Sequence, residues 1–271
     1  MLRTQCRRLS GFIPGIAAAV PATIMGLFLV LPLIALIWRA VTLEGSVSTS
    51  RLSVANAVFL SLGTTAITVV LIILLGTPLS YFLARSRFAL KRVLSVFVEI
   101  PIVMPPVVAG LALLATFGRR GLFGNLLAAL NVNITFTMAA VVMAQLFVST
   151  SFYIRAAQSR FESLPSQYED AAAVDGAGRW TIFWRVMVPQ SHRALLSGLI
   201  LSWARALGEF GATILFAGNL SGRTQTMPLL VYGALERDLR VTFVTALLLL
   251  ALAAVAFGLA RWLMGSDTDG E

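Results

Sequence analysis

Residues 165–190 read PSQYEDAAAVDGAGRWTIFWRVMVPQ, and this stretch decides how the rest of the chain is organised. It is the one long polar segment between strongly apolar runs. Ser166, followed three residues later by Glu169, forms a capping-box pattern that predicts a helix beginning near Gln167. Gly176 supplies the backbone freedom to end that helix. The stretch is therefore predicted to fold as two short helices joined at glycine.

The second helix of this predicted hairpin carries an apolar stripe. Its apolar side chains recur at intervals of three, four and seven residues, which places them on one helix face: Trp180, Phe183, Trp184 and Met187. The other side carries Arg179, Thr181 and Arg185. Taken alone, such a hairpin is also what an ordinary surface loop of a membrane protein would show.

Composition indicates a membrane protein. Of the 271 residues, 58% are hydrophobic and only 12% are charged, whereas a soluble domain carries about 25% charged residues. No polar region is long enough to fold alone, so a single domain is expected. The net charge of +9 does not indicate nucleic-acid binding, because the arginines occupy short loops, where they anchor topology. One cysteine, Cys6, and one histidine, His192, are too few for a disulfide or a transition-metal site.

Six apolar runs are long enough to cross a bilayer. They cover residues 16–38, 54–83, 93–117, 134–156, 194–217 and 241–263. The basic residues before the first run resemble the start of a signal peptide, but the run continues well beyond Ala17–Ala19 and is predicted to stay as an uncleaved span. An all-α chain is expected, with a basic tail over 1–15, one transmembrane domain over 16–263 and a short tail over 264–271.

The distribution of Lys and Arg predicts the orientation. With the N-terminus inside, the cytoplasmic segments carry thirteen of the 21 basic residues and the outer loops carry seven. Because basic residues are enriched in cytoplasmic loops, this bias favours both termini inside. It also places the hairpin in the cytoplasm, within a loop over 157–193.

The hairpin resembles the cytoplasmic coupling loop of ABC-transporter permease subunits, whose pattern is E-A-A, three residues, G, nine residues, I-x-L-P. The spacing matches throughout, at Asp170, Ala171, Ala172, Gly176 and Pro189. Asp stands for Glu at the first position, with Glu169 beside it, and valines stand for the Ile and Leu. The resemblance implies that the loop docks into a groove on a separate ATPase subunit, where the acidic pair would meet basic groups of that partner.

A break is predicted inside the third apolar run. Pro105 and Pro106 cannot donate helix hydrogen bonds, so the helix should kink there. Irregular backbone at membrane depth is tolerated where protein covers it or where it lines a cavity. The break therefore marks either a part of the translocation path or a packing kink without substrate contact.

Two opposite charges lie inside the fifth run. Arg205 and Glu209 are four residues apart, so they share a helix face and can pair. A lone charge at the bilayer centre costs about 2.5–3.5 kcal/mol on insertion scales, so the pair should face protein or water. Either Arg205 attracts an anion in the path, or the pair is a structural lock, which the neutralising carboxylate favours. Gly208 and Gly211 would permit close helix packing around it.

The run from Ser202 to Tyr232 is similar to permeases of molybdate/tungstate ABC importers. The motifs follow in the same order as in those permeases: an arginine, GEFGAT, an Asn, Thr-x-Thr, Pro and Tyr. The resemblance extends from about residue 50 onward, and sulfate/thiosulfate permeases are the alternative within the superfamily. It implies a type I importer permease, a multi-pass protein of a prokaryotic inner membrane, that imports molybdate or tungstate. It also implies an outer loop that faces an extracytoplasmic oxyanion-binding protein: Arg223, Thr224 and Thr226.

The chain itself is not expected to be an enzyme or to carry a cofactor. Its one lysine, Lys91, lacks the preceding G-x-x-x-x-G-K-[ST] loop that binds phosphates. The resemblance implies two copies of this permease with two ATPase subunits, which would bind ATP and Mg²⁺, and a binding protein. Two other classes compete: an ion-coupled secondary transporter, which would work alone in liposomes, and a scaffold, which would need neither paired charges nor a coupling loop.

Overall fold

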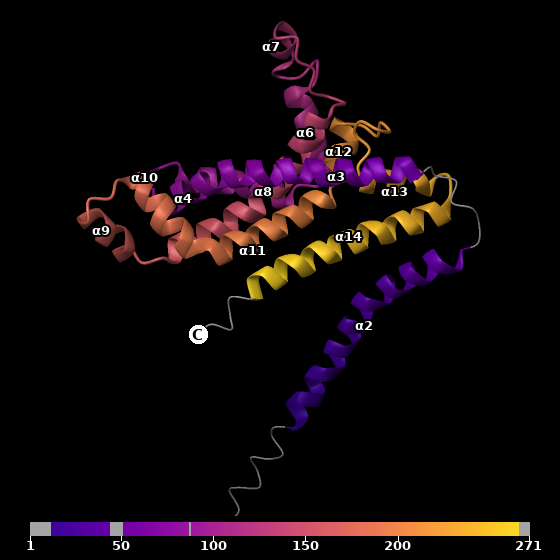
Figure 1. The fold of residues 1–271 in the computed structure, drawn as a ribbon, viewed down its shortest axis with the longest axis horizontal. Helices are drawn as coiled ribbons and strands as arrows, with labels where there is room; N and C mark the ends of the chain where they lie inside the picture. The colour runs from indigo at the N-terminus through magenta and orange to yellow at the C-terminus, as the bar shows by residue number, and fades with distance from the viewer. Residues whose placement is uncertain (1–11, 44–50, 87, 266–271) are drawn as a thin grey trace, which may run out of the picture.

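The computed structural model describes residues 12–43, 51–86 and 88–265, and the regular elements in these ranges are all helical (Figure 1). In chain order they are α2 (Phe12–Thr42), α3 (Arg51–Leu71), the π-helical turn η1 (Ile72–Gly76), α4 (Thr77–Arg85), α5 (Lys91–Val103), α6 (Pro106–Phe117), α7 (Gly124–Ala129), α8 (Met138–Ser163), α9 (Gln167–Val174), α10 (Arg179–Ile182), the π-helical turn η2 (Phe183–Met187), α11 (Val188–Leu207), α12 (Gly211–Phe216), α13 (Met227–Leu235) and α14 (Leu239–Gly265). The all-α prediction is confirmed for this part of the chain.

Four stretches are long and apolar enough to cross a membrane. They are Ala18–Thr42, Ser53–Arg85, Met138–Ser163 and Leu239–Gly258, which correspond to the first, second, fourth and sixth predicted runs. The prediction of six spans is not confirmed, because the third and fifth runs are interrupted and fold as the pairs α5–α6 and α11–α12. Most of each predicted tail, at residues 1–11 and 266–271, lies outside the described residues.

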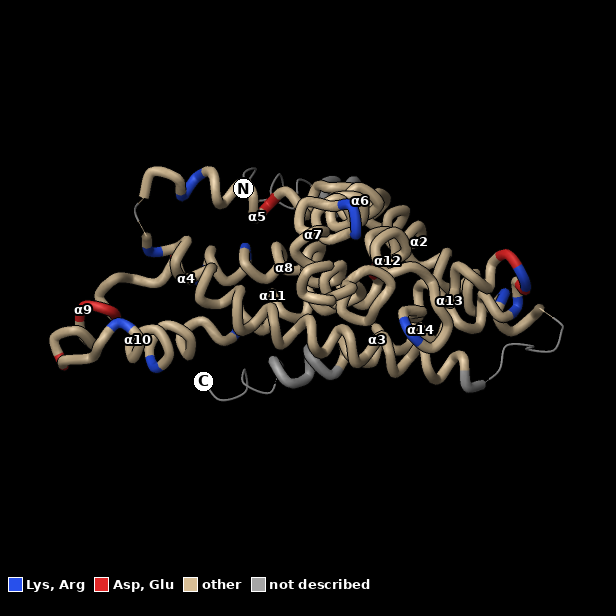
Figure 2. Tube along the Cα trace, turned by 90° about the horizontal axis from the view of Figure 1, so that it is seen from above, with Lys and Arg blue, Asp and Glu red and all other residues tan. Residues whose placement is uncertain are grey.

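The long helices form one stack. Figure 1 shows α3, α8, α11 and α14 running side by side, with α9 and α10 at one end of the stack and α13 at the other. Helices α6 and α12 stand across this stack, and α7 forms the tip of the projection. Seen from above, most charged residues lie at the two ends, while the middle of the stack carries few (Figure 2). That distribution is typical of a protein whose central part lies in a bilayer.

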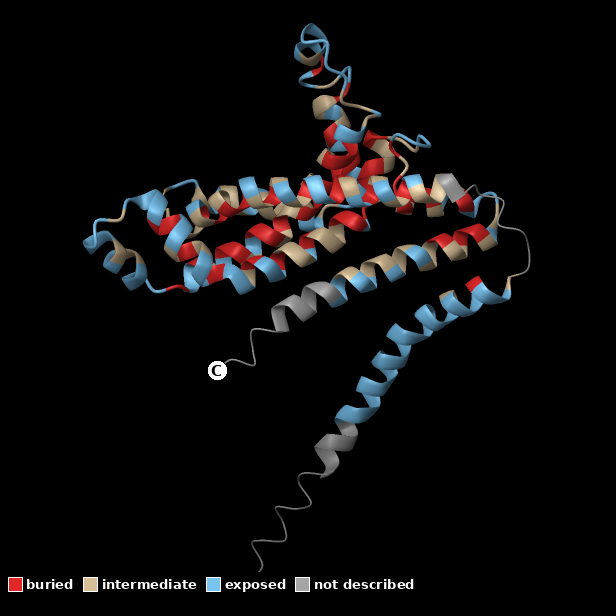
Figure 3. Ribbon diagram, in the orientation of Figure 1, coloured by how far each residue is buried: buried red, intermediate tan, exposed pale blue. Residues whose placement is uncertain are grey.

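Burial follows the faces along which the stacked helices meet. Figure 3 shows buried residues on α3, α8 and α11 where they touch, and an almost fully exposed α2, which packs against α14. Polar bonds join the helices inside the stack: the Tyr153 and Thr77 hydroxyls lie 2.6 Å apart, and Ser202 donates to the carbonyl of Ser149 at 2.8 Å. In a membrane such interhelical bonds contribute about 0.6 kcal/mol each. The helices are thus aligned by polar contacts as well as by packing.

Candidate functional site

The hairpin begins where the sequence predicts, but its first turn is held differently. Helix α9 starts at Gln167, yet the side chain of Ser166 makes no capping hydrogen bond. Glu169 turns instead toward α4, where its Oε1 accepts a hydrogen bond from Arg85 Nε at 2.6 Å. The capping-box prediction is therefore right about the helix start and wrong about the side chains. A charge-assisted hydrogen bond to a guanidinium is stronger than a neutral capping bond, which explains why Glu169 pairs with Arg85 instead of capping the helix.

Arg85 ties the hairpin to the stack. Besides Glu169, its guanidinium donates from Nη2 to the backbone carbonyl of Leu164 at 2.9 Å. Arg85 thus joins the end of α4, the end of α8 and the start of α9. Sequence patterns could not have found this contact, because 84 residues separate the two charged partners. Glu169 is thus paired within its own chain and partly exposed, whereas Asp170 is exposed; contact of the acidic pair with basic groups of a partner stays a prediction.

Gly176 ends α9 as predicted. Its φ of +83° lies in the left-handed region, which side chains other than glycine rarely adopt. The amide of Gly176 donates to Ala173 O and the amide of Ala177 to Ala172 O, both at 3.0 Å. These two bonds are a Schellman motif, which satisfies the last carbonyls of the helix. The sharp turn between the two hairpin helices therefore depends on glycine at this position.

The apolar stripe of the second hairpin helix divides between two surroundings. Phe183 and Met187 are buried against Tyr153 and Phe161 at the base of the hairpin, as is Ile182. The two tryptophans lie outward instead, with Trp180 70% exposed and Trp184 38% exposed. The apolar stripe is therefore wider than the face that contacts the stack, and its two tryptophans lie outside that face.

The outward face of the hairpin is a candidate docking surface. Asp170 and Ala171 are exposed on α9, Ala172 packs partly against the core, and Pro189 is exposed in the first turn of α11. Trp180 and Trp184 stand edge to face at 5.7 Å on the neighbouring segment. Exposed aromatic side chains are enriched at protein interfaces, where they anchor binding. This pair adds an apolar anchor that the motif alone did not indicate.

The interruptions of the third and fifth runs meet inside the fold. Helix α5 ends at Val103 and α6 begins at Pro106, with Met104 and Pro105 in extended conformation, so the break predicted at Pro105 and Pro106 is confirmed. Helix α11 ends at Leu207 and α12 begins at Gly211. Both short helices that follow, α6 and α12, pack against each other. The two breaks are therefore one structural feature.

Small residues bring α6 and α12 almost to backbone contact. A Cβ on Gly211 would lie 2.7 Å from the Cβ of Pro106, and a Cβ on Gly110 would lie 2.9 Å from the carbonyl oxygen of Ala212. Real atoms do not approach so closely, so neither glycine can carry a side chain without movement of its neighbour. Gly208, in contrast, is exposed, and among the described residues a Cβ on it would have only the carbonyl oxygen of Ala204, at 3.6 Å, within 4 Å. The prediction of close packing thus holds for Gly211 and is wrong for Gly208.

The predicted ion pair is formed at the break. Glu209 is only 1% exposed, and its Oε2 accepts a hydrogen bond from Arg205 Nη1 at 2.6 Å. Its other oxygen, Oε1, accepts the backbone amide of Ala212 at 2.7 Å. Glu209 therefore neutralises the arginine at the end of α11 and satisfies an amide in the first turn of α12. This double use of one carboxylate supports the structural-lock interpretation.

The outer loop after α12 is only partly available to a partner. Thr224 is buried, where its Oγ1 accepts the amide of Leu220 at 3.0 Å and donates to the carbonyl of Gly218 at 3.3 Å. Thr226 is also buried, whereas Arg223 is exposed. The expectation that all three face a binding protein is not met by the threonines in this conformation. A buried loop must satisfy its own polar backbone groups, and Thr224 serves that purpose.

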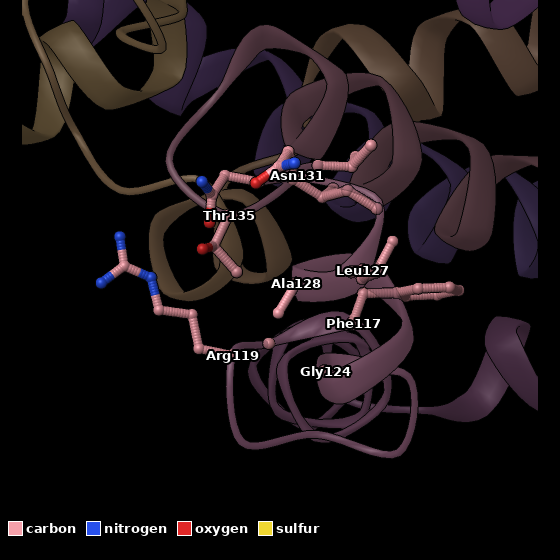
Figure 4. A pocket seen from close by; sticks show the side chains of 11 residues that line it. Phe117, Arg119, Gly124, Leu127, Ala128, Asn131 and Thr135 are labelled. Atoms are coloured by element: carbon pink, nitrogen blue, oxygen red, sulfur yellow. The ribbon is translucent and has the colours of Figure 1, made fainter.

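A cavity of about 360 Å³ lies at the tip formed by α6, α7 and the segment leading to α8. Figure 4 shows the side chains of Arg119, Asn131 and Thr135 around it, together with apolar residues of α7. Arg119 is the charged residue among those that line it. The tip, which projects from the middle of the stack, therefore carries a hollow with both polar and apolar lining residues and one arginine (Figure 1).

Comparison with known proteins gives consistent matches. Residues 76–264 match the family described as binding-protein-dependent transport system inner membrane component. The molybdenum transport system permease protein ModB of Mycobacterium tuberculosis is 40% identical over 267 residues, which cover 95% of this chain and 96% of that protein. The probable transport system permease protein NifC of Clostridium pasteurianum is 38% identical, over 78% of this chain and 74% of that protein. The sulfate transport system permease protein CysW of Synechococcus elongatus is 37% identical, over 72% and 68%.

Solved structures show the same fold. A chain of a bacterial alginate ABC transporter, in complex with an alginate pentasaccharide-bound periplasmic protein, superimposes with a TM-score of 0.72 at 14% identity, covering 95% of this chain and 97% of that one. A chain of the inward-facing MetNI methionine ABC transporter superimposes with a TM-score of 0.64 at 15% identity, covering 81% of this chain and all of that one. At these identities the likeness concerns the fold alone.

Proposed function

Because this chain belongs to the family of binding-protein-dependent transport system inner membrane components, we propose that it is the permease subunit of an ATP-driven importer of a tetrahedral oxyanion, molybdate or tungstate. The observation that carries the proposal is the 40% identity with a molybdenum permease over 95% of the chain. The hairpin, which has the coupling-loop pattern and an outward face, supports the same conclusion. The expected location is the inner membrane of a prokaryote, with both termini inside.

The mechanism that we infer is alternating access. Two ATPase subunits, which bind ATP and Mg²⁺, grip the outward faces of the hairpins on two copies of this chain. Movement of a hairpin passes through Arg85 and Glu169 to α4 and α8, since this charged contact joins all three elements. The interrupted helices then rearrange around the paired breaks, where irregular backbone can line a path. An extracytoplasmic binding protein delivers the anion to the opposite end.

The choice of anion is tested by competition. In a strain that depends on this chain for oxyanion uptake, unlabelled molybdate and tungstate should each suppress uptake of labelled molybdate at equimolar concentration, while sulfate should need at least a hundredfold excess. Equal suppression by sulfate would favour the second candidate, a sulfate permease, which the 37% identity with CysW supports. The three dianions share charge and tetrahedral shape, so the binding protein contributes to the selection as well.

The energy source is tested by reconstitution. The chain alone in liposomes is expected to give no uptake under a proton or sodium gradient, and uptake should appear only with the ATPase, ATP and the anion-loaded binding protein. Uptake by the chain alone would contradict the proposal and favour an ion-coupled secondary transporter.

The contact between α4 and the hairpin gives a further prediction. Arg85→Gln and Glu169→Gln should each lower the thermal stability slightly. The double variant should lose less stability than the two single variants lose together. Partly exposed ion pairs contribute about 0.2–1 kcal/mol, so a coupling energy in this range is expected in the double-mutant cycle. Strictly additive losses would show that the two side chains do not interact.

A further inference from the structure

The turn between α4 and α5 carries a shallow groove of about 790 Å³ beside the hairpin. Its lining comes from the turn and from the first turns of α5: Phe88, Ala89, Lys91, Arg92, Val93 and Ser95. Phe88 also borders the cavity between α4 and the hairpin, so the groove and the hairpin are neighbours. In Figure 2 basic residues mark this turn at the hairpin end of the stack.

The groove holds positive charge that the described part of the chain leaves largely unbalanced. Arg92 is exposed and makes no hydrogen bond or ion pair with any described residue. The Nζ of Lys91 has only long contacts, 3.4 Å to the carbonyl of Ala84 and 3.5 Å to Glu162 Oε1. Ser95 lies one helical turn after these two cations and therefore on the same side of α5. Two cations and a hydroxyl thus surround one small hollow.

An apolar strip continues from the groove along α5. Val93, Val96 and Phe97 are all exposed, Phe97 by 64%, and no residue of α5 is buried in the single chain. Glu99, one turn further, is paired with Arg155 at 2.8 Å and adds no free charge. A cationic hollow that is continuous with an exposed apolar strip matches a molecule with an anionic head and hydrocarbon chains.

We propose that this groove binds the phosphate group of an anionic phospholipid, whose acyl chains lie along the apolar strip of α5. Lys91 and Arg92 would hold the phosphate by charge-assisted hydrogen bonds, and Ser95 would donate a third. Basic clusters next to membrane-embedded helices attract anionic lipids in this way. A lipid bound here lies beside the hairpin. The lipid composition of the membrane would therefore affect the stability of the helix packing at that end of the stack. The proposal requires the chain to lie in a membrane, and it does not depend on which anion is transported.

The test is lipid binding to the purified full-length chain in neutral detergent, followed by native mass spectrometry. Only a few phosphatidylglycerol molecules should bind per chain, and their binding should saturate as the lipid concentration rises. Arg92→Gln should weaken this binding about fivefold, the loss expected for one cation near an anionic lipid. Phosphatidylcholine, without net charge, and glycerol 3-phosphate, without acyl chains, should bind at least tenfold more weakly. The matched control is Arg223→Gln, which removes another exposed arginine, from the loop between α12 and α13.

Unchanged phosphatidylglycerol binding in Arg92→Gln, or an equal loss in Arg223→Gln, would overturn the site and leave only general attraction by charge. Equal binding of glycerol 3-phosphate would show a site for free phosphate compounds, which overturns the lipid assignment. A second variant, Phe97→Asn, keeps every charge and should also weaken phosphatidylglycerol, because it interrupts the exposed strip. Since the readout is binding, failure of transport would not affect it.

Discussion

Glu209→Ala is expected to yield little folded protein, with the free energy of unfolding lowered by about 3 kcal/mol. The substitution removes the partner of Arg205 and the acceptor of the Ala212 amide together. A partly buried cation loses its counter-charge and a buried backbone donor loses its acceptor, and each such loss is costly in apolar surroundings. The fraction of monodisperse protein after purification and its Tm measure the effect.

The matched variants separate the two uses of this carboxylate. Glu209→Gln keeps an oxygen that can accept the Ala212 amide and loses only the charge, so its loss should be smaller. The double variant Arg205→Met with Glu209→Met removes both charges at once, and should regain much of the folded protein, because no unpaired charge remains. A wild-type Tm in Glu209→Ala would contradict the role of the pair as a lock.

The double variant also separates a structural from a functional arginine. Arg205 is 28% exposed, so one side of it is accessible although the carboxylate partner is buried. If the double variant folds and shows normal ATP-driven uptake, the pair has only a structural role. Folded double variant with at least tenfold lower uptake would place Arg205 on the path of the anion.

Gly176→Val is expected to lower ATP-driven uptake at least tenfold while ATP hydrolysis continues. A β-branched residue at a φ of +83° costs about 1–3 kcal/mol of backbone strain, although a Cβ there would meet no atom within 4 Å. The strain is therefore relieved by reshaping the turn between α9 and α10 rather than by unfolding the stack. The outward face of the hairpin would then no longer fit its partner. Uptake and ATPase activity of the reconstituted complex are measured together.

Gly178→Val is the matched control for this prediction. Gly178 lies two residues away, a Cβ on it would likewise meet no atom within 4 Å, and its φ of −70° is accessible to valine. This variant should transport normally, and Gly176→Asn should retain most uptake because asparagine tolerates left-handed backbone. Normal uptake in Gly176→Val, or an equal loss in Gly178→Val, would argue against a docking role that depends on the shape of this turn.

Local patterns in the sequence determined the features that depend on neighbouring residues. Apolar runs gave the all-α class, Pro105 and Pro106 gave the break before α6, and the spacing of Arg205 and Glu209 gave their pairing. Gly176 ended α9 as predicted. Each of these follows from backbone chemistry or from a distance of a few residues, which is why a single sequence suffices.

Contacts between distant segments were decided only by the tertiary structure. The ion pair of Glu169 with Arg85 replaced a local cap, and the buried positions of Thr224 and Thr226 removed them from the surface. The close contact of Gly110 with α12 brings together the breaks in the third and fifth runs, which lie far apart in the sequence. Local patterns do not specify which of several possible partners a charged or small residue will reach. That choice depends on how the helices stack, because packing brings residues together irrespective of their separation along the chain.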